Sequence, residues 1–435
     1  MTEEPVSAIG ESYPSTSECS DSDIAAAVMA VVERFELAGK SIVVLVPDGT
    51  RSAPMARIAR VVEATLMPSA ASVTWLVALG THQPMSTEAL ALHLGPVTGT
   101  VRNHDWADDG TFVSLGSIGS SEMAELTNGR LDEEVEVRIN RLVAEADAAL
   151  VCGPVFPHEV VGYSGGNKYF FPGVSGPEVI DATHWLGALQ TSRALIGTLG
   201  VTPVRAVIDR AASMVPTLRC ATCFVVAPGG TRLAGIFPGT PEESFAAAAA
   251  LSAEVHVRWL DHPVRRVISI LPERYDDMWT GAKGMYKVEP VVRDGGEVLL
   301  FAPHITEFSR THGALLAEIG YHVRDYFVGQ WGSFSRIPGR VLAHSTHLRG
   351  DGTWSEDGGE RPRITVTLAT GIDEDRCRQH GLGYLDHAAV DLAALRADPD
   401  EDLLVVEEAG ETLYRLRPDS SRTAAASSPS SASSG

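Results

Sequence analysis

Apolar positions along the chain follow two patterns, which predict strands and helices in regular succession. Ser41–Val46 and Val73–Leu79 are short apolar runs bounded by polar loops, as is typical of buried strands. Around them, Ile24–Leu37 and Pro54–Met67 carry apolar residues at helical spacing. Because strands alternate with helices in this way, the N-terminal half predicts a parallel sheet covered by helices.

The same alternation continues toward the C-terminus, with a change of composition on the way. After Asp261-His262-Pro263 a new strand starts at Arg266–Leu271, which predicts a domain boundary near residue 262. The other elements expected are strands at Ala148–Cys152, Cys223–Ala227, Glu297–Ala302, Val341–His344 and Ile364–Leu368, helices at Arg138–Ala146, Pro177–Arg193, Pro241–Val255, Gly281–Val292, Arg310–Ile319 and His387–Ala397, and a hairpin of Leu403–Glu407 with Thr412–Leu416.

These elements predict an α/β protein with two domains, at residues 23–262 and 263–418. A chain of 435 residues is too long for one ordinary core, and its 44% hydrophobic content is enough for two. The polar ends, residues 1–22 and 419–435, contain little to bury, so we expect both to be disordered.

Charge and cysteine content narrow the classes of partner and compartment. The net charge of -21 argues against nucleic acid or an anionic membrane as a partner. The chain has neither a long apolar span nor an apolar, basic N-terminus, and its five cysteines are sparse, so we expect a cytoplasmic protein. The lone Cys220-Ala-Thr-Cys223 pair is more typical of strand packing than of a metal site.

The segment Gly153–Gly173 is the most unusual stretch of the chain. Its adjacent glycines, Gly165 and Gly166, allow tight backbone turns whose N–H groups can point at an anion. Lys168 follows them, but Tyr169 stands where a phosphate-binding P-loop needs a hydroxyl residue that binds magnesium. A lysine close to adjacent glycines is instead suited to covalent attachment of a cofactor, because its amine can be positioned and desolvated.

Ionisable residues follow three of the predicted strands. Asp48 and Arg51 come after the first, His82 after the second, and His158 after the third. Because the carboxyl ends of parallel strands border the ligand crevice, we expect these side chains to meet there. The two histidines could act as proton donor and acceptor near neutral pH. An ordinary alternative is that Asp48 or Thr50 caps a helix and that the histidines serve only turns and packing.

Two further residues have competing interpretations. His184 lies among apolar residues and could be a core histidine. Lys283 begins a predicted helix, where a bound anion would suit it, although it could also be a solvated surface lysine. The string that starts at His158-Glu159 resembles a zinc-protease motif, but Gly162 replaces the second histidine, which excludes that interpretation.

Six stretches together resemble one known family. In chain order they are PDGTR, GTH, NHDW, PHEVVGYSGGNKYFFPGVSG, THWLG and GAK, within residues 41–325. They resemble the nickel-dependent lactate racemases and related 2-hydroxyacid racemases and epimerases. The resemblance implies two Rossmann-like α/β domains with the active site in the cleft between them.

The resemblance also implies a cofactor and the roles of particular residues. The cofactor would be the nickel-pincer nucleotide, pyridinium-3,5-bisthiocarboxylic acid mononucleotide nickel, attached covalently at Lys168. The roles it implies are His82 and His158 as catalytic acid/bases, His184 as the nickel ligand, Asp48, Ser164, Gly165 and Gly166 beside the cofactor, and Arg51, Lys283, Trp279 and Thr280 beside the substrate.

The implied reaction is racemisation or epimerisation of a small 2-hydroxyacid by hydride transfer, with one histidine on each side of the reacting carbon. Gln83 stands where the family usually has Arg, and Trp279-Thr280 replaces a Tyr-Gln pair. These departures favour a substrate side chain larger than methyl. Cofactor-maturation proteins are implied as partners, and homo-oligomerisation stays open.

Two other classes of function remain as alternatives. The glycines and Lys168 would also suit a nucleotide- or phosphate-binding protein without racemase activity. An NAD-dependent dehydrogenase is disfavoured, because the first strand ends in PDGTR and lacks the glycine fingerprint of dinucleotide binding.

Overall fold

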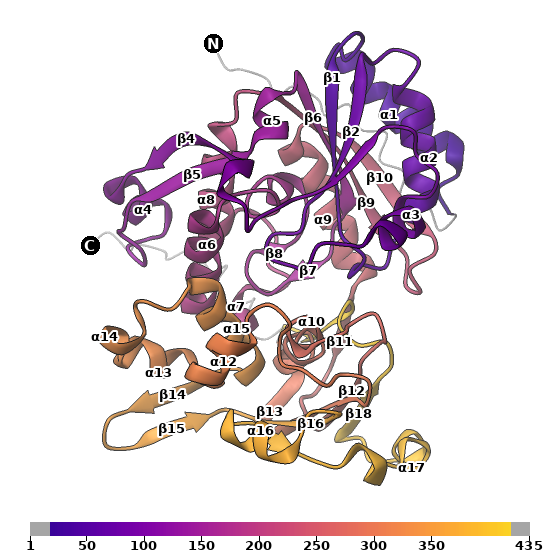
Figure 1. The fold of residues 1–435 in the computed structure, drawn as a ribbon. Helices are drawn as coiled ribbons and strands as arrows, with labels where there is room; N and C mark the ends of the chain where they lie inside the picture. The colour runs from indigo at the N-terminus through magenta and orange to yellow at the C-terminus, as the bar shows by residue number, and fades with distance from the viewer. Residues whose placement is uncertain (1–17, 419–435) are drawn as a thin grey trace, which may run out of the picture.

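The structure is a computed structural model that describes residues 18–418, and it confirms the α/β class (Figure 1). Its N-terminal half is built on a six-stranded sheet, in which neighbouring strands run parallel except for the antiparallel pair β9 and β10. The strand order is β10 (Leu233–Gly239), β9 (Leu218–Val226), β6 (Ala148–Pro154), β1 (Ser41–Val46), β2 (Ser72–Val77) and β3 (Thr100–Asn103).

Helices cover both faces of this sheet. Ile42, Val44 and Val46 of β1 pack with α1 (Asp21–Arg34) and α2 (Met55–Leu66). Successive residues of a strand point to opposite faces, so Val43 and Leu45 pack on the other side. The helices on that side are α6 (Pro177–Gln190), α8 (Pro203–Ser213) and α9 (Pro241–Val255). Burial on both faces explains why β1 is a continuous apolar run in the sequence.

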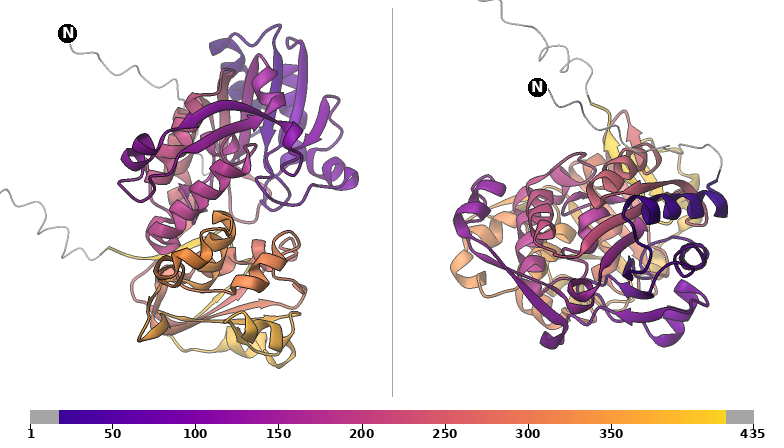
Figure 2. Two further views of the ribbon diagram at one scale, coloured as in Figure 1. Left: turned by 60° about the vertical axis from the view of Figure 1, so that its left-hand side comes forward. Right: turned by 90° about the horizontal axis from the view of Figure 1, so that it is seen from above.

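The C-terminal half contains a second, fully parallel sheet below the first in Figure 1. Figure 2 shows the two halves as separate lobes that meet along one side. A short parallel pair of β11 (Val257–Leu260) and β19 (Leu413–Leu416) joins the end of the first half to the last strand. The second sheet has the order β17 (Gly383–Tyr384), β16 (Thr365–Thr370), β13 (Val292–Ala302), β12 (Val264–Ile270) and β18 (Leu403–Val406).

Several predicted elements are wrong. The predicted helices Gly281–Val292 and His387–Ala397 are each divided into shorter α-helices and 3₁₀ turns. Val341–His344 belongs to helix α15 (Gly339–Arg349), because a short apolar run does not by itself distinguish a strand from a buried helix. Strand β18 pairs with β12, and β19 pairs with β11, so the predicted hairpin does not form. The predicted helix Arg138–Ala146 is divided between β5 (Val135–Asn140) and α5 (Arg141–Glu145).

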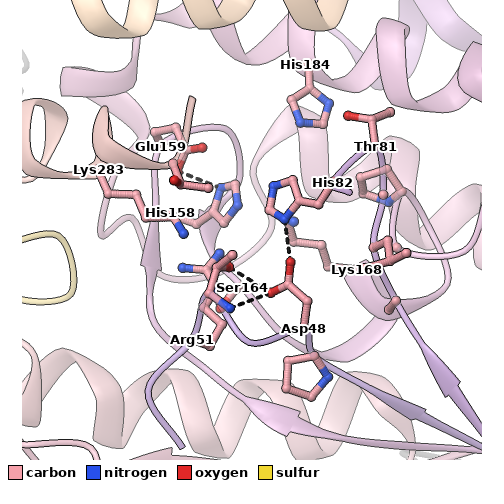
Figure 3. Close-up of a pocket in the computed structure, with 18 of the residues that line it drawn as sticks. Asp48, Arg51, Thr81, His82, His158, Glu159, Ser164, Lys168, His184 and Lys283 are labelled. Atoms are coloured by element: carbon pink, nitrogen blue, oxygen red, sulfur yellow. Dashed lines mark hydrogen bonds and ion pairs between the residues drawn. The ribbon is translucent and has the colours of Figure 1, made fainter. Parts of the chain in front are cut away.

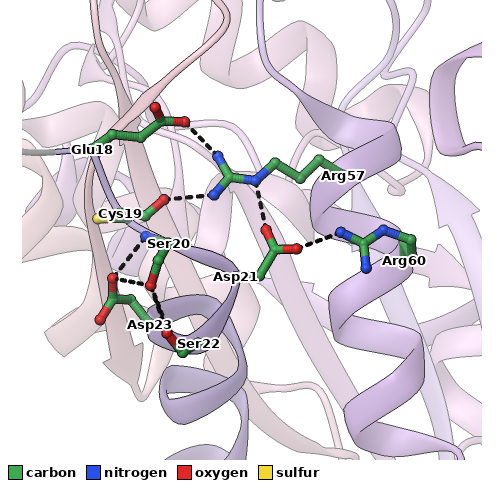
Figure 4. A network of polar contacts seen from close by, with 8 residues as sticks. All are labelled: Glu18, Cys19, Ser20, Asp21, Ser22, Asp23, Arg57 and Arg60. Atoms are coloured by element: carbon green, nitrogen blue, oxygen red, sulfur yellow. Dashed lines mark hydrogen bonds and ion pairs between the residues drawn. The ribbon is translucent and has the colours of Figure 1, made fainter.

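Residues 18–22, which the sequence analysis expects to be disordered, have defined positions in the structure. The Ser20 side chain caps α1 by accepting a hydrogen bond from the Asp23 backbone N–H. Arg57 of α2 bonds Glu18, Asp21 and the Cys19 carbonyl, each at 2.7 Å (Figure 4). This network attaches the chain start to α2. The predicted disorder of residues 1–17 and 419–435 concerns positions outside the described residues.

The remaining elements are short, and three two-stranded sheets, β4 with β5, β7 with β8 and β14 with β15, stand apart from the two large sheets. No helix within residues 18–418 is long and apolar enough to cross a membrane. The other helices are α3 (Thr87–Leu94), α4 (Ser120–Leu126), α7 (Ser192–Leu195), α10 (Met278–Gly281), α11 (Lys283–Tyr286), α12 (Gly313–Ile319), α13 (Arg324–Gly329), α14 (Trp331–Phe334), α16 (Glu374–Gln379) and α17 (Leu392–Ala397), and the other strands are β4 (Phe112–Ile118), β7 (Pro157–His158), β8 (Gly162–Tyr163), β14 (Gly352–Ser355) and β15 (Gly359–Pro362).

Candidate active site

A cavity of about 150 Å³ lies where the loops after β1, β2 and β6 meet helices of the C-terminal half. Gly166, expected beside the cofactor, does not line it, because a Cβ there would lie 2.7 Å from Phe245 Cβ on α9. The other predicted site residues all line this cavity: Asp48, Arg51, His82, His158, Ser164, Gly165, Lys168, His184, Trp279, Thr280 and Lys283 (Figure 3).

The loops after β1 and β2 bring His82 and Asp48 together. His82 Nδ1 lies 2.5 Å from Asp48 Oδ2, so Nδ1–H donates to the carboxylate and Nε2 keeps a free lone pair. Burial alone would raise the pKa of Asp48, but His82 and Lys283 outweigh that effect and lower it. Thr50 also donates its hydroxyl to Asp48 Oδ1 at 2.7 Å. The Asp48 carboxylate, fixed by Thr50, therefore orients the His82 ring so that Nε2 can accept a proton.

His158 has a different hydrogen-bonding arrangement. The backbone N–H of Val160 donates to His158 Nδ1 at 3.2 Å, so the neutral ring carries its proton on Nε2. Burial and the positive charges of Lys168 and Arg51 lower the pKa of His158. Glu159 Oε2 lies 3.2 Å from the same Nδ1 and would stabilise the ring if it became protonated. The two histidines thus start from opposite tautomers.

Lys168 reaches the cavity from a short 3₁₀ turn, residues 166–169, after Gly165. Burial, together with the charge of Arg51, lowers the pKa of Lys168 to about 8. A neutral amine is a nucleophile, and the protonated form is not. At neutral pH a larger fraction of this amine is therefore unprotonated than in an ordinary surface lysine.

Arg205 of α8 donates hydrogen bonds to the backbone of the loop that contains Gly165 and Gly166, called here the glycine loop. The sequence analysis did not predict this contact. Arg205 is 2% exposed and donates to the carbonyls of Gly165 at 3.1 Å and Tyr163 at 2.6 Å. Its guanidinium carbon lies 3.9 Å from the centre of the Phe245 ring. Gly165 itself has a φ of +97°, which strongly favours glycine at this position.

His184 on α6 presents one nitrogen to the cavity. Its Nδ1 lies 2.7 Å from the Ile180 carbonyl, so Nδ1–H donates there and Nε2 is unprotonated. Burial and the charge of Lys168 lower the pKa of His184 to about 3, which keeps the ring neutral. A neutral imidazole with its other nitrogen fixed by a backbone carbonyl is the form that binds metals. Within residues 18–418 no group of three potential metal-ligating side chains is found.

Arg51 and Lys283 place two cationic groups on the side of the cavity near His158 (Figure 3). Lys283 is 6% exposed, and no hydrogen-bond partner is found for its Nζ within the described residues. Burial and the charge of Arg51 lower the pKa of Lys283 to about 7. An unpaired buried amine is costly unless a ligand satisfies it. The pair is suited to binding a carboxylate.

The C-terminal half contributes a helix face that the sequence analysis missed. Arg340, His344 and His347 of α15 all line the cavity, at positions i, i+4 and i+7 of one helix. That spacing is itself a signal, because it puts three polar side chains on one face. Arg340 also donates to Asp181 of α6 at 2.6 Å and so joins the two halves close to His184.

The distribution of lysine is a second missed signal. The sequence contains only four lysines, Lys40, Lys168, Lys283 and Lys287. Two line the cavity, and Lys287, which is 1% exposed, donates to the Pro157 carbonyl beside His158 at 2.6 Å. In a chain that otherwise uses arginine for positive charge, lysine is concentrated at the site.

Comparisons with known proteins point to one family. Residues 24–197 match the family described as the lactate racemase N-terminal domain. The lactate racemase of Thermoanaerobacterium thermosaccharolyticum is 24% identical over 269 residues, which are 60% of this chain and 60% of that protein. The lactate racemase of Lactiplantibacillus plantarum is 29% identical over 161 residues, 37% of this chain and 36% of that protein.

Two solved structures share the fold. A crystal structure of a Thermotoga maritima protein has a TM-score of 0.84 and 31% identity, covering 92% of this chain and 99% of its own. The lactate racemase apoprotein of T. thermosaccharolyticum has a TM-score of 0.68 and 19% identity, covering 92% and 94%. Together these comparisons show that the chain contains a lactate racemase N-terminal domain at residues 24–197 and that 92% of it shares the fold of a lactate racemase apoprotein.

Proposed function

We propose that this protein is a racemase or epimerase that inverts the carbon bearing the hydroxyl group of a 2-hydroxyacid. The observation that carries the proposal is that His82 and His158 line one cavity, together with the cationic pair Arg51 and Lys283. Inversion of a carbon requires proton exchange on either side of the substrate, whereas a simple oxidation requires one base. The match to the lactate racemase N-terminal domain supports the same reaction type.

The residues present fit the nickel-pincer nucleotide as cofactor. Lys168 offers an amine with a pKa of about 8 for covalent attachment, and His184 offers an unprotonated Nε2 for the metal. Gly165 has no room for a side chain, because a Cβ would lie 2.5 Å from Val155 Cγ2, and the tight loop that it allows brings Ser164 and Lys168 to the cavity. The chemistry supplied by the bound cofactor is reversible acceptance of the Cα hydride.

Substrate binding in this proposal depends on Arg51 and Lys283. A carboxylate between them would supply the hydrogen bonds that Lys283 Nζ lacks, and the guanidinium can bind both carboxylate oxygens. This contact fixes the carboxylate end and leaves the hydroxyl and Cα to face the histidines. Because Lys283 is already buried at the site and Arg51 is half-buried beside it, we expect little reorganisation on binding.

Proton transfer is assigned to the two histidines. His82 Nε2 accepts the hydroxyl proton of one stereoisomer, while Asp48 stabilises the resulting imidazolium. For the other stereoisomer, His158 accepts the hydroxyl proton at Nε2, which requires the ring to leave its resting tautomer and carry its own proton on Nδ1, toward Glu159. In each direction one histidine starts neutral and accepts the hydroxyl proton, while the other starts as the imidazolium and gives its Nε2 proton to the product oxygen, so the pair exchanges its charge in each turnover.

The surroundings of the site are consistent with this assignment. The cavity is lined by side chains from both halves, so residues of both halves can contact one bound substrate. We further propose domains at 23–262 and 263–418, a cytoplasmic location, and loading by separate cofactor-maturation proteins.

The experiment is to co-express the chain with such maturation proteins and measure nickel content, intact mass and turnover. We expect one nickel per chain, an adduct on Lys168, and exchange of configuration for at least one 2-hydroxyacid by chiral chromatography. The Lys168→Ala variant should lack the adduct. Fully loaded protein that changes the configuration of no 2-hydroxyacid would refute the proposal and favour the nucleotide-binding alternative.

A further inference from the structure

A second cavity, of about 510 Å³, lies at the junction of the two halves, where helices α6 and α15 end (Figure 1). The N-terminal half contributes residues 188 and 190–192 to its lining, and the C-terminal half contributes parts of α13, α15, β14 and β15. Among the described residues, His347 is the one lining residue that it shares with the catalytic cavity. A volume of this size is typical of sites for small molecules.

The charged residues of this cavity are mostly cationic. In the part of the chain that the structure describes, Arg324, Arg361 and Arg363 line it, against one carboxylate, that of Asp351. Asp351 is paired with Arg193 at 3.5 Å. In a chain with a net charge of -21, this group of arginines makes a local site for an anion.

Arg361 is the arginine that is free to bind a ligand. Arg324 donates to the Asp325 carboxylate at 2.6 Å, and Arg363 donates to the Val292 carbonyl at 2.6 Å. Arg361 is exposed, and no hydrogen bond or ion pair is found for its guanidinium within residues 18–418. The planar guanidinium can bind two oxygens of one phosphate group.

Thr353 and Ser192 add hydroxyl groups to this site. Thr353 lies directly opposite Arg361 in the antiparallel pair of β14 and β15, so the two side chains are on the same face of that pair. Ser192, the first residue of α7, lines the cavity from the other half and is 4% exposed. Neither hydroxyl has a hydrogen-bond partner among the described residues. A buried hydroxyl without a partner is costly, and a phosphate oxygen would accept its proton.

Thr191, which lines the same cavity, has an unusual backbone conformation. It lies between α6 and α7, and its φ is +66°, which β-branched residues rarely adopt. Such strain persists only where the surrounding structure imposes it, and it is concentrated at binding and catalytic sites. Its position here agrees with a ligand site between the halves.

The ends of two helices determine how a ligand is oriented. Helix α6 ends at Gln190 and α15 at Arg349, and the last carbonyls of a helix have no partner within it. The negative end of the helix dipole disfavours a phosphate there. These carbonyls accept hydrogen bonds instead, as the Leu189 carbonyl does from Arg324 at 3.1 Å. Hydroxyl groups therefore suit the helix ends, and a phosphate suits the side formed by β14 and β15.

We propose that this cavity binds a small phosphorylated polyol or sugar, with the phosphate against Arg361, Thr353 and Ser192 and the hydroxyl groups toward the ends of α6 and α15. The proposal goes beyond the racemase function and concerns a separate site. Because the ligand contacts both halves, its binding stabilises the arrangement of the halves that assembles the catalytic cavity.

The test is calorimetric titration of the complete, cofactor-free chain at constant ionic strength with glycerol 3-phosphate, inorganic phosphate, glycerol and succinate. We expect a Kd of about 1 mM or lower for glycerol 3-phosphate, binding of inorganic phosphate that is at least about fivefold weaker, and no measurable binding of glycerol or succinate. Bound glycerol 3-phosphate should also slow amide hydrogen exchange in both α7 and β14.

Variants separate this cavity from the catalytic one. Arg361→Gln and Thr353→Glu should each weaken binding of glycerol 3-phosphate at least about tenfold, because one removes the cation and the other adds a negative charge beside it. Both positions are exposed, so we expect the fold to be retained. Arg232→Gln, at an exposed arginine between β9 and β10, is the matched control and should leave the affinity unchanged. Lys283→Met, which removes a cation of the catalytic cavity, should leave it unchanged as well.

Each outcome decides one part of the proposal. Wild-type affinity in Arg361→Gln, or loss of binding in Lys283→Met, would overturn the assignment to this cavity. Tighter binding of succinate would overturn the phosphate, and equal binding of inorganic phosphate would overturn the polyol or sugar part. No measurable binding of glycerol 3-phosphate would overturn the site itself. None of these titrations requires the cofactor, so their result is independent of whether the racemase function holds.

Discussion

The buried amine of Lys283 has a cost to folding that can be measured without any cofactor. Its pKa falls from 10.5 to about 7 in the folded chain, where Nζ is buried against the Tyr275 ring at 4.8 Å. Since the unfolded chain binds the proton more tightly, the fold is destabilised whenever the unfolded lysine is charged. At about 1.36 kcal/mol per pKa unit, this shift corresponds to about 4 kcal/mol at pH 7 and about 2 kcal/mol at pH 9.

We therefore expect Lys283→Met to stabilise the protein while abolishing binding of the substrate carboxylate. The gain in free energy of unfolding should be about 4 kcal/mol at pH 7 and should shrink to about 2 kcal/mol at pH 9. Urea unfolding followed by circular dichroism at both pH values measures it. Lys40→Met, at a partly exposed position, is the matched control and should change little. An unchanged or lower stability of Lys283→Met at pH 7, or a gain that does not depend on pH, would refute the reasoning.

Three further predictions concern the catalytic and cofactor residues. His82→Asn and His158→Asn should each keep the adduct on Lys168 but lower kcat by about 10²–10⁴-fold, as judged by intact mass and chiral chromatography; loss of the adduct instead would contradict their assignment. In the cofactor-free chain, acylation of Lys168 followed by peptide mass spectrometry should reach half its maximal rate near pH 8, below which the amine is protonated, and a midpoint near 10 would be inconsistent with its burial. Arg205→Met leaves the carbonyls of Gly165 and Tyr163 without their donor, so we expect a loss of about 1–3 kcal/mol in the free energy of unfolding and a smaller fraction of chains with the adduct. Wild-type values for both measurements would contradict that role.

Most strands and helices of the N-terminal half could be predicted from the local pattern of apolar residues alone. The apolar run Ser41–Val46 and the helical spacing of Pro54–Met67 each correspond to an observed element, β1 and α2. Because parallel strands open onto a crevice at their carboxyl ends, the sequence alone predicts that Asp48, His82 and His158 lie at one site, and all three line the cavity. These inferences succeed because burial on one or both faces leaves its period in the sequence.

Other features depended on contacts between distant segments. The predicted strand at Val341–His344 is part of α15, and its polar side chains face the cavity because α15 packs on α6. Strand β19 pairs with β11 and not with β18, although β18 precedes it directly in the sequence. Gly166 lies against α9 and away from the cavity, although it adjoins Gly165 in the chain.

By itself, the sequence determined the α/β class, the succession of most strands and helices, the glycine loop with its lysine, and the set of ionisable residues at the strand ends. Only the tertiary structure decided the tautomers of the two histidines, the lowered pKa values of Lys168 and Lys283, and the helix face that closes the site. The physical reason is that periodicity and turn chemistry act over a few neighbouring residues. Burial, hydrogen-bond partners and nearby charges also come from segments that lie tens to hundreds of positions apart, as Asp48 does from His82 and Arg51 from Lys283.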